Sequence, residues 1–399
     1  MTRWATAFLV IAACSSSNNK GHEGPDAAPP APDAAIDAQN IVMGMPTQPT
    51  VISDGGHVLA APKVVPVFFA GDGTAQATVE DFLAMLPSSS YWTAISQEYG
   101  VGTLTIAPTV IATETPPTDD NAIQALVDAH AGGTGGWPAD DANTIYALFF
   151  PDGVTITGNG TSCVDYGGYH AETNSNNVYA VMPRCSSMTY PGLDYVTIAT
   201  SHEVLEASTD PHPYTDPAYA DVDDDHAIWG LVPGGELGDM CETAKASFQP
   251  LLGTYWVQRT WSNVSAAAGH DPCVPVMATP YVEAMTNLPD ISIDDGQGGA
   301  FTTRGVTVPV GQSKTVEVDL YADAPTADWT VVPVDAVSTF EKTSPELSFQ
   351  LDRTTGNNGD KLQLTITRLK SGSFGGISEL ELQSQVDGVI ASTWFALVN

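Results

Sequence analysis

The chain has 399 residues, which is enough for two domains of ordinary size. Its 13 lysines and arginines stand against 47 aspartates and glutamates, and the net charge of −34 repels nucleic-acid phosphates and anionic headgroups. We therefore expect no nucleic-acid partner, and we expect an extracellular protein with many oxygen ligands for divalent cations.

The first residues predict export to the cell envelope. Arg3 precedes an apolar run from Trp4 to Ala13, which is too short to span a bilayer and typical of a secretory signal. The run ends in "IAAC", which resembles a bacterial lipobox and implies a lipoprotein signal peptide at 1–13 with lipid on Cys14. Ser15 after it favours the outer membrane, by resemblance to Gram-negative sorting rules. We expect an outer-membrane, surface-exposed or extracellular protein held to the membrane through Cys14; an ordinary signal peptide with an incidental cysteine is the alternative.

Residues 14–50 predict a disordered tether rich in Ala, Pro and Asp. The stretch "GPDAAPPAPDAAIDAQ" has too few large apolar side chains to offset the entropy that ordering would cost. Structure is expected from about Val51 onward.

Residues 51–275 predict a mixed α/β domain. Runs of β-branched and aromatic residues indicate buried strands in "KVVPVFFAG", "NTIYALFFPDGVTI" and "NVYAVMP", and "GTLTIAPTVIA" indicates a strand pair. Helical spacing follows the first strand, with a break at Pro87, and recurs in "NAIQALVDAHA". The strongest helix is predicted at 193–209 and ends at Asp210, because Pro211 disfavours a helical conformation in the residue before it.

Four cysteines remain in the exported chain, and we expect two disulfides. Three pairings are possible; Cys163–Cys185 and Cys241–Cys273 are favoured because each closes a short local loop. Zinc binding by these cysteines is the weaker alternative, since no CxxC spacing is present.

Residues 276–399 predict an all-β, Ig-like sandwich domain. Stretches such as "KTVEVDLYA", "KLQLTITRL" and "STWFALV" alternate with period two and are separated by turn residues. No catalytic cluster stands out, which favours an adhesive or spacer role.

The segment "TSHEVLEASTDP" contains the clearest candidates for metal-binding and catalytic residues. His202 and Glu206 are four residues apart on a helix and share a face, so one cation could be held by an imidazole and a carboxylate. Glu203 stands where HExxH zinc hydrolases place the general base. Glu206 replaces the second histidine, which shifts preference toward harder cations without forbidding zinc.

Several stretches together resemble the EXORDIUM / phosphate-induced protein family. They are "VPVFFAGDGT", "CVDYGGYH", "SHEVLEASTDP", "GGELGDMC" and "YWVQRTWSNVSAAAGHDPC", and they run in family order over about 55–275. The resemblance implies an extracellular, wall- or matrix-associated protein with a zincin-like fold, in which the HExxE and EIGD segments have been likened to zinc metallopeptidases.

The resemblance also implies a zinc site. Its first ligand set is His202, Glu206 and Glu236, with Glu203 as the base. Alternatives for ligands or supporting residues are Asp210, Asp239, His170 and His212. His212 is the weakest of these, because Thr209 replaces the glycine expected in metzincins and Pro211 alters the path of the chain.

Calcium is a second cofactor candidate, since "DVDDDH" at 221–226 clusters carboxylates as a calcium loop does, although a solvated acidic loop is its simpler interpretation. Two functions remain open. One is a lipid-anchored zincin-like metallopeptidase that cleaves extracellular peptides with metal-activated water. The other is a non-catalytic envelope or matrix-binding lipoprotein with a structural calcium or hydrogen-bond site, whose sandwich binds a partner or polysaccharide.

Overall fold

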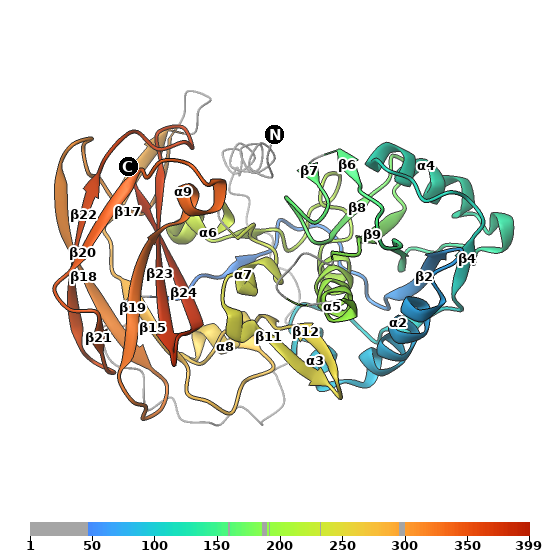
Figure 1. Ribbon diagram of the computed structural model, residues 1–399, viewed down its shortest axis with the longest axis horizontal. Helices are drawn as coiled ribbons and strands as arrows, with labels where there is room; N and C mark the ends of the chain where they lie inside the picture. Colours follow the sequence, from blue (N-terminus) through green and yellow to red (C-terminus); the bar gives the residue numbers. More distant parts are fainter. Residues whose placement is uncertain (1–46, 159, 186–189, 191, 232, 295–299) are drawn as a thin grey trace, which may run out of the picture.

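The computed structural model describes residues 47–158, 160–185, 190, 192–231, 233–294 and 300–399 (Figure 1). The expected signal peptide, Cys14 and nearly all of the expected tether lie outside these residues. Among the helices described, none is both long and apolar enough to cross a membrane.

The first part of the chain is a mixed α/β unit around a six-stranded sheet with strand order β3-β2-β5-β9-β8, in which β4 also pairs with β2. Its strands are β2 (Lys63–Phe69), β3 (Thr105–Ile106), β4 (Val110–Ala112), β5 (Thr144–Phe149), β8 (Tyr169–Glu172) and β9 (Val178–Met182). β2, β5 and β9 run parallel, and β8 is antiparallel to β9. The expected strand pair at 102–112 forms β3 and β4, which each pair with β2 rather than with one another.

Helices cover both faces of this sheet, which explains why its strands are apolar on both sides. Val64 and Phe68 of β2 pack with α2 (Gly73–Met85) and α5 (Leu193–Thr209), whereas Val65 and Val67 pack with α4 (Asp120–His130). The break expected at Pro87 separates α2 from α3 (Ser90–Ile95).

Helix α5 ends at Thr209, as expected, with Asp210 as its C-cap. It is buried on all sides from Val196 to Thr209, so its hydroxyl groups are shielded from solvent and need hydrogen-bond partners within the protein. They turn back onto the helix instead: Thr200 donates to the carbonyl of Val196, and Ser208 donates to that of Val204. A helix this enclosed holds its histidine and glutamates in fixed positions.

Short elements follow α5 and lead to its flank. They are β10 (Asp221–Val222), which pairs with β1 (Val51–Ile52), then α6 (Ala227–Leu231), α7 (Asp239–Glu242), β11 (Phe248–Leu252), β12 (Tyr255–Gln258), β13 (Thr260–Trp261), α8 (Asn263–Ala267) and β14 (Cys273–Val274). β11 and β12 form a hairpin, and β12 lies along α5. Both favoured disulfides are formed, with Cα–Cα distances of 5.0 Å for Cys163–Cys185 and 5.9 Å for Cys241–Cys273.

The remainder of the chain is β-rich, as expected. A four-stranded sheet has the order β15-β18-β22-β20, and a six-stranded sheet has the order β16-β17-β24-β23-β19-β21. The elements are β15 (Val282–Thr286), β16 (Asp290–Asp294), β17 (Ala300–Val306), β18 (Ser313–Ala322), β19 (Trp329–Asp335), α9 (Ala336–Glu341), β20 (Leu347–Leu351), β21 (Thr355–Gly356), β22 (Lys361–Arg368), β23 (Ser378–Val386) and β24 (Val389–Val398). Leu364 of the first sheet and Leu382 of the second belong to one hydrophobic core, so the two sheets share an interior.

The β-rich part packs directly on the α/β part, with α6, α7 and α8 between them in Figure 1. Trp229 of α6 lies edge-on to Trp394 and Phe395 of β24, with ring centroids 5.7 and 5.0 Å apart. The hydroxyl oxygens of Thr243 and Thr393 are 2.6 Å apart across the same contact. One continuous hydrophobic cluster therefore runs through both parts.

Candidate metal centre

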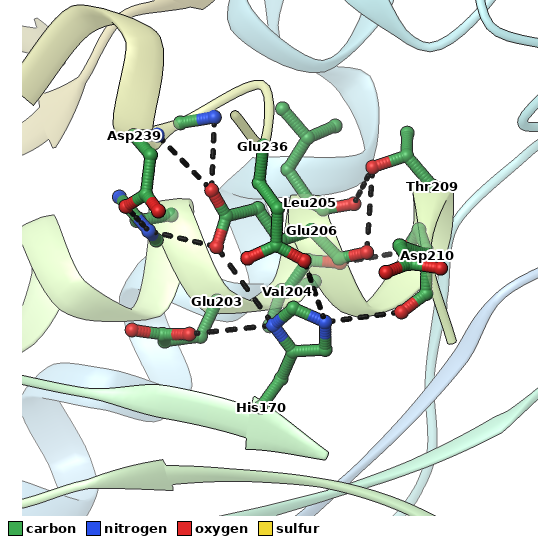
Figure 2. Close-up of polar contacts among 12 residues, drawn as sticks. His170, Glu203, Val204, Leu205, Glu206, Thr209, Asp210, Glu236 and Asp239 are labelled. Atoms are coloured by element: carbon green, nitrogen blue, oxygen red, sulfur yellow. Dashed lines mark hydrogen bonds and ion pairs between the residues drawn. The ribbon is translucent and has the colours of Figure 1, made fainter. Parts of the chain in front are cut away.

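Three segments that are distant in sequence bring two imidazoles and five carboxylates together inside the molecule (Figure 2). Helix α5 supplies His202, Glu203, Glu206 and its C-cap Asp210, and β8 supplies His170. The glycine-rich segment that leads into α7 supplies Glu236 and Asp239.

His202 is held so that one ring nitrogen faces acids. Its Nδ1 lies 3.1 Å from Oε1 of Gln258, whose amide nitrogen donates to the carbonyl of Gly238 at 2.6 Å. Oε1 is therefore the acceptor and Nδ1 carries a proton. Nε2 lies 2.8 Å from Oε2 of Glu206 and 3.4 Å from Oδ1 of Asp239. Burial would lower the pKa of His202, but Glu206 and Glu203 raise it well above its usual value, so without a cation Nε2 carries a proton too. A cation in place of that proton would find the arrangement of a metal-binding histidine, with a supporting acceptor on the other nitrogen.

The other oxygen of Glu206 is fixed by the start of α7. Its Oε1 accepts the backbone N–H groups of Gly238 at 3.0 Å and Asp239 at 3.1 Å. A Cβ on Gly238 would lie 2.7 Å from both Glu206 Oε1 and His202 Nδ1, so only glycine lets the chain approach this closely.

His170 lies between the remaining acids, as Figure 2 shows. Its Nε2 is 3.0 Å from the backbone oxygen of Asp210 and 3.5 Å from Oε1 of Glu236. Its Nδ1 is 3.7 Å from Oε2 of Glu203 and 3.8 Å from Oε2 of Glu206. His170 thus connects Glu236 to the HExxE helix.

The charges in this cluster shift the pKa values of its members. Burial alone would lower the pKa of His170, but the neighbouring carboxylates of Glu236, Glu203 and Glu206 outweigh burial and raise it to about 10. Burial raises the pKa of Glu206 and raises that of Glu236 well above its usual range, each opposed by a histidine. Burial therefore favours the protonated form of these acids, and an ionised acid here needs positive charge beside it.

Three groups of these residues have ligand atoms within 4.8 Å of one another: His202–Glu206–Asp239, His170–Glu203–Glu206 and His170–Asp210–Glu236. Two buried oxygens, Oδ1 of Asp239 and Oδ2 of Asp210, have no hydrogen-bond partner. If all five carboxylates are ionised, their negative charge exceeds the positive charge of two protonated imidazoles. The cluster can hold a metal ion, because a divalent cation supplies the missing charge and ligates the unpartnered oxygens.

The first ligand set expected from the sequence is divided between two of these groups. His202 and Glu206 lie together, but Asp239 joins them, whereas Glu236 lies beside His170. The alternatives Asp210, Asp239 and His170 all belong to the cluster; His212 belongs to none of the three groups found among the described residues. Gln258 was not predicted, because nothing local distinguishes a supporting glutamine from any other.

The acidic side chains of residues 221–226 do not surround a common point. Asp223 accepts a hydrogen bond from His226 and from the backbone of Thr50, and Asp225 pairs with Arg304 at 2.9 Å. None of the three ligand groups of the described chain includes these residues.

The carboxylates of the cluster differ in their exposure to solvent. Glu203 is 4% exposed, and a Cβ on Gly168 would lie 2.5 Å from its Oε1, so the "YGGYH" backbone covers this carboxylate. The side chain of Glu236 is 20% exposed. Solvent therefore reaches the cluster more readily beside Glu236 than beside Glu203.

Comparison with known proteins adds little to this geometry. No family model and no curated protein matches the chain. A structure of surface layer protein SbsC, domains 1–6, aligns with a TM-score of 0.19 and 16% identity over 32% of this chain and 14% of that one. Wild-type OgpA from Akkermansia muciniphila aligns with a TM-score of 0.24 and 11% identity over 88% of this chain and 95% of that one. This chain thus spans a small fraction of the surface layer protein, and neither TM-score carries an argument about fold or function.

Proposed function

We propose that this chain is a lipid-anchored, extracellular, zincin-like metalloprotein that hydrolyses peptide bonds. The observation that supports it is the convergence of His202 Nε2, Glu206 Oε2 and Asp239 Oδ1, with Glu203 next to the histidine in the HExxE helix. The resemblance to the EXORDIUM family, the two disulfides and the signal-like first residues agree with the proposal.

Zinc is the proposed metal, held by one imidazole and two carboxylates. The third ligand in this proposal is Asp239 rather than Glu236, because the carboxylate of Asp239 is the one that faces His202. A zinc ion held there would act as a Lewis acid toward a peptide carbonyl.

The chain's own residues would then do the following. Glu203 would accept a proton from the attacking water as the general base. His170, whose Nδ1 is 3.7 Å from Oε2 of Glu203, would orient that carboxylate. Gln258 would hold the His202 ring, and the N–H groups of Gly238 and Asp239 would hold Glu206.

A second function is favoured by one observation, the burial of Glu203 under Gly168. A general base must reach water and substrate. In this alternative the chain is a non-catalytic envelope or matrix-binding lipoprotein, the cluster holds a structural calcium ion or a hydrogen-bond network, and the Ig-like sandwich binds a partner or polysaccharide.

The deciding experiment pairs metal analysis with a peptide-library assay on the wild type and Glu203→Gln. We expect zinc in both proteins, cleavage by the wild type, and a loss of rate of about 100-fold or more in the variant. Glu172→Gln, which alters a nearby buried acid outside the three ligand groups, should keep both zinc and activity. A wild type that binds no zinc and cleaves no peptide would favour the alternative.

A further inference from the structure

We infer that the cluster holds a second divalent cation, bound by His170, Asp210 and Glu236. The inference deepens the proposed function, since it takes the position formed by His202, Glu206 and Asp239 as the first. The two ligand groups have no residue in common, so each can be removed by substitution without changing a ligand of the other.

The distances within the second group suit a common ion. His170 Nε2 lies 3.0 Å from the backbone oxygen of Asp210 and 3.5 Å from Oε1 of Glu236. Ligands held about 2.0–2.2 Å from one ion at tetrahedral or octahedral angles lie about 3.0–3.6 Å from each other. Nε2–H of His170 donates to this carbonyl oxygen, and an ion that replaced the proton would have the Asp210 oxygen within reach as an additional ligand.

An independent observation concerns the side chain of Asp210. Its Oδ1 accepts the backbone N–H of Ala218 at 2.6 Å, but Oδ2 has no hydrogen-bond partner, and the residue is 0% exposed. A carboxylate oxygen this deeply buried is costly without a donor or a cation. The side chain belongs to the same ligand group as His170 and Glu236.

The balance of charge supports a second ion as well. A divalent cation at the first position offsets Glu206 and Asp239 and leaves Glu203, Asp210 and Glu236. Within the described chain, the ion pairs of Glu203 and Glu236 are to His170, and none involves a lysine or arginine. One imidazole cannot neutralise three ionised carboxylates, so all three can be ionised together only with a second cation beside them.

The test is a count of bound ions. The purified chain is stripped with a chelator, reloaded with Zn²⁺, desalted and analysed by elemental mass spectrometry. We expect two zinc ions per chain in the wild type and one in each of Asp210→Asn, Glu236→Gln and Asp239→Asn. Asparagine at 210 keeps an oxygen for the N–H of Ala218, so the loop should remain in place.

Glu172→Gln is the matched control. Glu172 is a buried acid whose Oε1 accepts the N–H groups of Tyr214 and Thr215, and it belongs to none of the three ligand groups. It should keep two ions. If Glu172→Gln also binds only one ion, the assignment of the second ion to Asp210 and Glu236 is overturned.

One zinc ion in the wild type, retained in Asp210→Asn and Glu236→Gln, would also overturn the inference and leave His170 as a protonated counter-charge. The wild-type count decides even if a variant does not fold. Failure of the proposed function gives a different result, namely two ions and no peptide cleavage.

Discussion

Gln258 shows how a single uncharged side chain can determine what a histidine does. Its amide nitrogen donates to the carbonyl of Gly238 and its oxygen faces Nδ1 of His202, so the ring is locked with Nε2 toward Glu206 and Asp239. Supporting partners of this kind orient a metal-binding imidazole and make it more basic.

Gln258→Leu should therefore weaken Zn²⁺ binding by about 10–100-fold, because the ring loses its anchor while the ligands remain. Competition with a chromogenic chelator measures the affinity. Gln249→Leu is the control, since Gln249 lies in the same hairpin but donates to the carbonyl of Ala246. Equal affinities in the wild type and the Gln258 variant would contradict a supporting role.

Glu283 is a buried acid outside the cluster and predicts a dependence of stability on pH. Tyr281 donates to its Oε2 at 2.9 Å and the N–H of Ala284 to its Oε1 at 3.1 Å, but burial raises its pKa from 4.5 to about 8. Below pH 4.5 the carboxyl is protonated in both the folded and unfolded chain. Between pH 4.5 and 8 the unfolded chain releases this proton and the folded chain retains it, so stability falls as pH rises.

Glu283→Gln should remove this contribution. The free energy of unfolding of the wild type should fall, relative to the variant, by about 1.4 kcal/mol per pH unit over that range. Urea unfolding at pH 5, 6, 7 and 8 measures the difference, with the exposed Glu317→Gln as control. Parallel pH profiles for wild type and Glu283→Gln would show that the carboxyl is not retained in protonated form.

At the scale of elements, α7 is short but carries much of the site. It supplies Asp239 and the N–H groups that hold Glu206, and Cys241 in the same helix is tied to Cys273 of β14. Four residues of helix have little stability of their own, so the disulfide and its surroundings keep Asp239 facing His202.

Replacing Cys241 and Cys273 together by Ala should lower the free energy of unfolding by about 3–4 kcal/mol, as expected for a bridge across 32 residues. It should also weaken Zn²⁺ binding. Replacing Cys163 and Cys185, which span 22 residues, should cost similar stability but affect the zinc of the first position less, because that loop carries only His170, a ligand of the second position. Equal loss of zinc affinity in both pairs would contradict the special role of α7.

These elements also show what the sequence could predict. Helix α5 was predicted to its last residue, because apolar spacing and Pro211 act locally. Glu236 was placed ahead of Asp239 as the third ligand, and the sequence could not show that Asp239 faces His202, since the path from 234 to 239 depends on Gly234 and Gly235 at φ of 131° and 87° and on contact with α5. A contact between two distant segments cannot be predicted from the residues of either segment alone.

At the scale of the whole molecule, the two parts of the chain are joined by aromatic packing rather than by a free linker. Trp229 contacts Trp261 of its own part, with centroids 5.7 Å apart, and Trp394 and Phe395 of the other. His226 lies edge-on to Trp394 at 5.8 Å. A core shared in this way couples the stability of the β-rich part to that of the α/β part.

We expect the chain to unfold in one calorimetric transition, and Trp394→Ala to lower the free energy of that transition by about 3–5 kcal/mol. Trp329→Ala is the comparison, at a buried tryptophan of β19 that pairs with Gly356 of β21. If the wild type gives two separate transitions, and Trp394→Ala shifts only one, the two parts are independent.

The burial of the cluster should set the rate of ion release as well as the affinity for the ion. Its ligands are mostly 0–8% exposed and come from an enclosed helix, a sheet strand and a disulfide-tied segment. A chelator too large to enter can act only when the chain opens locally, so ion release should follow the opening rate rather than the chelator concentration. An ion bound there during folding would be released only as fast as the chain opens.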